Sequence, residues 1–171
     1  MMAIPAAELL ELARSLPIPV PWDRQAFIRS VAEMRGRPIT LLPIDTASEE
    51  LTNSPCGVWL MREHDDVIVH EMGTSEYHID QICLHEVGHM LLGHRRPVTE
   101  HPDQLRAEQI AALQDVLPTL DLESIHSLLL RSHYNSEQER DAEMFANVLM
   151  VAAAAAADEQ SMMRGVFFRR R

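Results

Sequence analysis

Residues 85–89, which read HEVGH, constrain the fold more than any other segment because their polar side chains act together only on a helix. Side chains four residues apart on a helix project from one face, so His85 and His89 can approach a common ligand. Glu86 lies beside them, about 100° round the helix axis from His85. The opposite stripe is apolar and consists of Leu84, Val87 and Leu91. The pattern therefore predicts a helix over residues 76–92 with one face in the core.

Two histidines and a glutamate at this spacing are typical of a metal site. Zinc binds neutral imidazole nitrogens, and a catalytic site has a third protein ligand and a position for water. The metal makes that water more acidic, and Glu86 is placed to accept its proton during attack on a carbonyl. Gly88 costs about 1 kcal/mol relative to Ala in a helix interior, which favours a close neighbour there. We therefore expect one Zn²⁺ ion on His85 and His89, with Glu86 as the catalytic residue.

A third ligand is needed, and two nearby positions fit poorly. A histidine six residues after His89 would complete the metzincin pattern, but Arg95 occupies that position. His94 lies nine residues after His85, about half a turn out of phase on a continuous helix. His94 comes near the site only if the helix has already ended at Gly93.

A better third ligand lies in the acidic segment 136–146. Here the chain resembles the gluzincins, which commonly use a glutamate on a later helix, with Ala three residues on and an acid four residues on. Glu139, Ala142 and Glu143 match this spacing. We expect Glu139 to bind the metal and Glu143 to accept the free N–H of a ligand histidine. Ala142 and Ala146 would let the two helices approach closely. The competing interpretation is a solvated acidic helix start, since acids favour helix N-termini.

Other polar residues are weaker candidates. A carbonyl attacked by water needs a hydrogen-bond donor for the oxygen that becomes negative. Possible donors are His133, Tyr134, His126 and Tyr77, and no spacing argument selects among them. His78 is expected at the rim of the site, and Cys83 is expected in the core.

The order of elements along the chain predicts one α+β domain over residues 1–171. Further helices are expected over 6–16, 22–35, 103–116, 122–131 and 136–157, and strands over 39–44, 57–62 and 67–70. Residues 1–20 form the first helix and a proline-rich connector. Residues 158–171 are expected to be a flexible tail. The fold class is thus a small zincin-like domain, with about three strands packed against the metal-binding helix and the later glutamate-bearing helix.

Composition excludes several functions. A net charge of -11 argues against direct binding to nucleic acid, which requires a basic surface. Charged residues interrupt the apolar N-terminal stretch, so it does not resemble a signal peptide. No segment approaches the roughly 20 apolar residues of a membrane span. The two cysteines show no disulfide or metal-binding spacing. These features predict a cytoplasmic protein without a membrane segment.

The segment HEVGHMLLGH, followed later by ERDAEMFANVLM, resembles the ImmA/IrrE group of bacterial zinc metallopeptidases over about residues 20–150. This resemblance implies that His85, His89 and Glu139 bind the metal and that Glu86 is the catalytic acid/base. It also implies a cytoplasmic protein partner, because several members are described as cleaving a helix-turn-helix repressor. We therefore expect a zinc endopeptidase acting on a DNA-binding repressor or a similar protein. The alternative is a metal-stabilised regulatory protein that sequesters a partner without cutting it.

Overall fold

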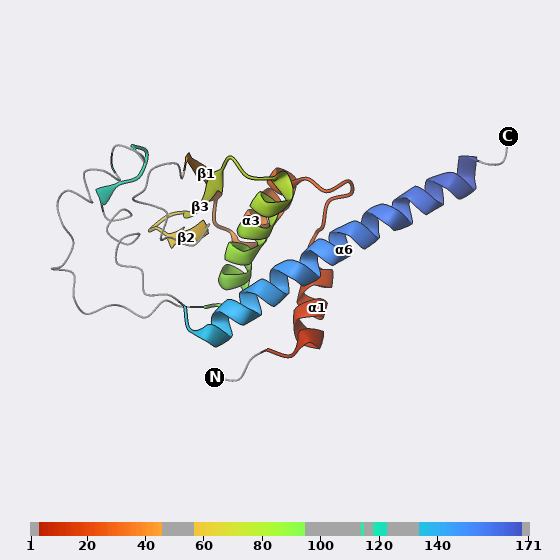
Figure 1. Cartoon of the computed structure of the whole chain (residues 1–171), viewed down its shortest axis with the longest axis horizontal. Helices are drawn as coiled ribbons and strands as arrows, with labels where there is room; N and C mark the ends of the chain where they lie inside the picture. The colour runs from red at the N-terminus through yellow and green to blue at the C-terminus, as the bar shows by residue number, and fades with distance from the viewer. Residues whose placement is uncertain (1–3, 46–56, 95–113, 115–117, 123–133, 169–171) are drawn as a thin grey trace.

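The computed structural model describes residues 4–45, 57–94, 114, 118–122 and 134–168. In these residues the chain is α+β, with a mixed sheet and helices packed against it (Figure 1). The helices are α1 (Ala6–Ser15), α2 (Arg24–Arg35), α3 (Glu76–Leu91) and α6 (Ser136–Phe168), and the strands are β1 (Ile39–Asp45), β2 (Gly57–Met61) and β3 (Asp66–Met72). The expected α+β class and three strands are confirmed. The helices expected over 103–116 and 122–131 lie almost wholly outside the described residues.

The three strands form a sheet in the order β1-β3-β2. β1 runs parallel to β3, whereas β2 pairs with β3 antiparallel, with Trp59 opposite Ile68. Alternate residues of a strand face opposite sides, and β3 follows this rule. Ile68 joins the main core, whereas Val67 and Val69 join a smaller cluster on the other side. Because the strand order is β1-β3-β2, β2 is an edge strand within the described sheet.

The main core joins the helices to one face of the sheet. It includes Leu9, Phe27, Ile68, Leu84, Phe145 and Leu149, all of which are almost fully buried. Helix α3 packs against both α6 and strands β2 and β3, and α1 packs against α6. Helix α3 therefore lies between the sheet and the glutamate-bearing helix (Figure 1).

Helix α6 is longer than the sequence indicates. The expected end at Ala157 is wrong, because the helix continues to Phe168 and includes most of the expected tail. Residues 158–164 contain neither proline nor glycine, so nothing there stops a helix. Figure 1 shows this end of α6 extending beyond the other elements. Within the described residues, no helix has the length and apolarity needed to cross a membrane.

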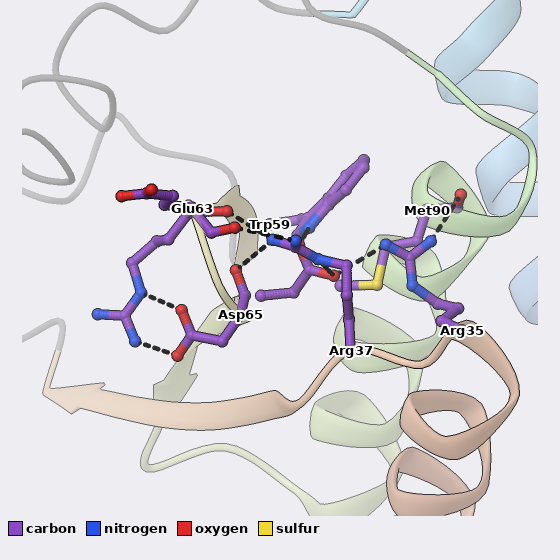
Figure 2. A network of polar contacts seen from close by, with 8 residues as sticks. Arg35, Arg37, Trp59, Glu63, Asp65 and Met90 are labelled. Carbon is purple, nitrogen blue, oxygen red and sulfur yellow. Dashed lines mark hydrogen bonds and ion pairs between the residues drawn. The ribbon is translucent and has the colours of Figure 1, made fainter.

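A polar network fixes the sheet against α2 and the end of α3. The buried carboxylate of Asp66 accepts hydrogen bonds from Arg35 at 2.8 Å, from Arg37 at 3.3 Å and from the Trp59 indole at 3.0 Å. Arg35 also reaches the Met90 carbonyl, as Figure 2 shows. The buried carboxylate of Asp66 on β3 therefore joins this strand to α2 through Arg35 and to β2 through Trp59.

Candidate metal centre

Helix α3 begins and ends with well-defined caps. The Ser75 hydroxyl accepts a hydrogen bond from the His78 amide at 3.2 Å, as an N-cap does. At the other end Gly93 adopts a left-handed conformation with φ of 66°, which glycine tolerates. The last turns between these caps carry His85, which is partly exposed, and His89, which is fully buried.

The side chains of His85, His89 and Glu139 converge, as the sequence predicts. One ligand atom from each lies within 4.8 Å of the others. The two Nε2 atoms are 3.0 Å apart, and the Glu139 oxygens lie 3.2 Å from His85 Nε2 and 3.9 Å from His89 Nε2. Ligands about 2.1 Å from a tetrahedral zinc ion are about 3.4 Å apart, so these spacings suit a shared ion. The cluster could hold a metal ion.

Helix α6 begins with a capping box that places Glu139 in its first turns. The Asn135 side chain accepts hydrogen bonds from the amides of Glu137 and Gln138, at 3.1 and 2.9 Å. The backbone amide of Asn135 donates to the Gln138 side chain at 3.2 Å. This reciprocal arrangement fixes the start of the helix. Glu139, one turn further on, is still partly exposed, so the site is open to solvent on this side.

Close contact between α3 and α6 depends on Gly88. A Cβ atom at this position would lie 3.2 Å from Ala142 Cα, 3.3 Å from the Ala142 carbonyl oxygen and 3.1 Å from the Phe145 ring. Two of these three neighbours are backbone atoms, which cannot move without shifting α6. The expected close neighbour of Gly88 and the expected role of Ala142 are both confirmed.

We expect Gly88→Ala to destabilise the fold and to weaken metal binding. Alanine gains about 1 kcal/mol in helix propensity, but forcing extra volume into this contact costs about 1–3 kcal/mol. The substitution also moves Glu139 away from the histidines. Urea unfolding and a zinc titration measure the two effects, with Gln25→Ala at an exposed position of α2 as the control. A more stable Gly88→Ala protein with normal zinc affinity would contradict this account.

Glu86 lies between α3 and the edge strand β2. Its side chain is buried, and Oε2 accepts a hydrogen bond from the Trp59 amide at 2.8 Å. Strand β2 passes so close that a Cβ atom on Gly57 would lie 2.3 Å from Ile82 Cγ2. The carboxylate of Glu86 is therefore held against β2, and it lies close enough to His85 for its negative charge to raise the pKa of that histidine.

The acids around His85 change its protonation. Burial alone would lower the pKa of His85, but the hydrogen bond that His85 donates to Glu139 and the negative charges of Glu86, Glu139 and Glu143 outweigh burial and raise this pKa. The site therefore has an excess of negative charge, which favours a cation.

His94 contacts the site. The sequence predicted this contact only for a helix that has ended at Gly93. The helix has ended by Gly93, and the His94 amide donates to the His89 carbonyl at 3.0 Å. This turn brings His94 Nδ1 to 2.9 Å from His89 Nδ1. His94 thus occupies the position beside His89 where Glu143 was expected. Glu143 is exposed, and among the described residues it makes no hydrogen bond to His89.

The other candidates are placed as follows. Tyr134 is buried with its ring stacked on His89, at 3.6 Å between centroids and 11° between planes. Tyr77 is exposed, and His78 pairs with Glu71 at 3.1 Å. Cys83 is in the core as expected, and burial raises the pKa of its thiol to about 12. The candidates His133 and His126 lie outside the described residues.

Comparisons with protein-family models, with curated proteins and with solved structures find no significant match to this chain. The class of site is therefore defined by its geometry alone, as a candidate His–His–Glu metal centre with a neighbouring glutamate.

Proposed function

We propose that this protein is a zinc-dependent peptidase with a zincin-like site. The observation that carries the proposal is the convergence of His85, His89 and Glu139, from two helices, beside the carboxylate of Glu86. Two imidazoles and one carboxylate suit zinc among the common metals, and three protein ligands leave one position open. Partial exposure of Glu139 and His85 gives a substrate access to that position.

The chain's own residues have separate roles in this chemistry. When bound, zinc polarises a water molecule and the carbonyl of the substrate. Glu86 accepts the proton of that water on its carboxylate and later delivers it to the leaving amine. The Trp59 amide keeps this carboxylate in one orientation during both transfers. Tyr134 and His133 remain the predicted donors to the negative oxygen.

The proposed substrate is a cytoplasmic protein, of the DNA-binding repressor type. This part rests on the resemblance of the HEVGHMLLGH and ERDAEMFANVLM segments to ImmA/IrrE peptidases. The net charge of -11 agrees with a protein partner, because an acidic chain is repelled by nucleic acid. A repressor with a basic DNA-binding surface would be attracted to it.

Zinc titration and a cleavage assay test the proposal together. Protein treated with a chelator should bind one zinc ion per chain, and His85→Ala and Glu139→Ala should each weaken that binding strongly. Incubation with a random peptide library, read by mass spectrometry, should give new peptide termini only in the presence of zinc. Absence of zinc binding would exclude the metal site, and zinc binding without cleavage of any peptide would exclude the peptidase.

One observation favours a second candidate, a metal-stabilised regulator that binds a partner without cutting it. The Glu86 carboxylate is buried and holds strand β2 through the Trp59 amide, so it has a structural use independent of catalysis. In such a protein the metal would stabilise the contact between α3 and α6. Loss of the metal would then disturb partner binding, whereas loss of the Glu86 charge would not.

A further inference from the structure

The pair formed by His89 and His94 has a property that the ligand set alone does not explain. Both rings are buried, and their Nδ1 atoms lie 2.9 Å apart, which is a hydrogen-bonding distance. A hydrogen bond between two ring nitrogens contains one proton, so one ring donates and the other accepts. The metal-binding role of His89 determines which ring is the donor.

His89 directs its Nε2 atom at the candidate metal position. That atom lies 3.0 Å from His85 Nε2 and 3.9 Å from Glu139 Oε1. A metal ligand needs a free lone pair on Nε2, so neutral His89 must carry its proton on Nδ1. His94 Nδ1 must then be the acceptor, and His94 must carry its own proton on Nε2.

We propose that His94 is a positioning residue, which holds His89 in its metal-binding tautomer by accepting the His89 Nδ1–H. The inference rests on the metal site of the proposed function and does not depend on peptide cleavage. Without an acceptor, this buried N–H would be unsatisfied, and the other tautomer, with its proton on Nε2, would compete with the metal. Tyr134 supports the same geometry because its stacked ring fixes the plane of His89.

The local backbone makes this contact specific. The end of α3 at Gly93 turns the chain, and the hydrogen bond from the His94 amide to the His89 carbonyl ties the two residues together. A neutral imidazole also differs from the carboxylate that often accepts from a ligand histidine. It adds no negative charge, so a divalent ion with Glu139 as its one charged ligand keeps a net positive charge. That charge favours polarisation of a carbonyl.

Zinc affinity of His94 variants tests the proposal. His94→Leu removes the acceptor, and a 10- to 100-fold loss of affinity is expected, about the effect of removing such a partner. His94→Asn places an amide oxygen near the lost Nδ1 atom and should restore most of the affinity. His64→Leu, at a highly exposed histidine, is the control and should bind zinc normally. Affinity is measured by competition with a chromophoric chelator, and circular dichroism confirms folding.

The ¹⁵N shifts of the His89 ring in the zinc-loaded protein give a readout that a merely structural role would not change. Wild type should show a metal-bound Nε2, a protonated Nδ1 and a coupling from that Nδ1 to His94 Nδ1 across the hydrogen bond, and this measurement decides the matter if His94→Leu does not fold. Normal zinc affinity in folded His94→Leu, or an unprotonated His89 Nδ1, would overturn the inference while leaving the metal site intact. Failure of wild type to bind zinc would overturn both.

Discussion

Glu86→Gln is expected to leave zinc bound while slowing peptide hydrolysis by about 10²- to 10⁴-fold, the usual effect of removing a general base. Glutamine has the same shape as glutamate, and its amide oxygen can still accept the hydrogen bond from the Trp59 amide. It cannot accept a proton from water. Zinc content by mass spectrometry and the rate of peptide cleavage measure the two properties separately.

Glu76→Gln provides the matched control for this experiment. Glu76 lies on the same helix but is exposed and pairs with Arg24, so the same chemical change should leave hydrolysis unaffected. Cleavage at the wild-type rate by zinc-loaded Glu86→Gln would rule out Glu86 as the base. If partner binding persists in Glu86→Gln and no cleavage occurs in wild type, the regulator is the correct function.

Asp66→Ala is expected to destabilise the fold by about 3–5 kcal/mol, the range found when one partner of a buried ion pair is removed. The side chain of Asp66 is fully buried, and those of Arg35 and Arg37 are partly buried. Removing the carboxylate takes away the acceptor of the Trp59 indole and one acceptor of each guanidinium group, although Arg35 keeps the Met90 carbonyl and Arg37 keeps backbone carbonyls. Urea unfolding in the presence of a chelator measures the loss without a contribution from bound metal.

The neighbouring residue offers a direct control. Asp65 forms its ion pair with Arg62 in a partly exposed position, and the hydrogen bond from Arg62 lowers the pKa of Asp65. Such pairs typically contribute at most about 1 kcal/mol, so Asp65→Ala should have a small effect. Its backbone carbonyl, which accepts from Arg37, is retained. Equal losses in the two variants would show that the Asp66 network is not the source of stability.

The sequence predicted the parts of the site that depend on local periodicity. His85 and His89 share a helix face because of their spacing, whereas Glu139 was assigned from the resemblance of its segment to the gluzincin pattern. Gly88 was unusual enough in a helix interior to indicate a close neighbour. These features can be predicted from short segments, because the helical repeat determines which side chains lie on one face.

The remaining contacts depend on geometry that no short pattern records. The approach of His94 to His89 depends on the direction in which the backbone turns after α3, and the predicted helix end near Leu92 does not give that direction. The Asp66 network joins residues from three elements that lie far apart in the sequence, so no local sequence pattern predicts their contacts. The end of α6 was placed too early because no proline or glycine marks it until Gly165.

The origin of the ligands on two helices has a consequence for folding. Glu139 follows His89 by 50 residues, so a metal ion held by both would act as a cross-link that closes a long loop. A covalent cross-link of that length lowers the entropy of the unfolded chain by an amount worth about 4 kcal/mol. Metal supply would then determine how long the folded chain survives proteolysis, as well as whether its site can react.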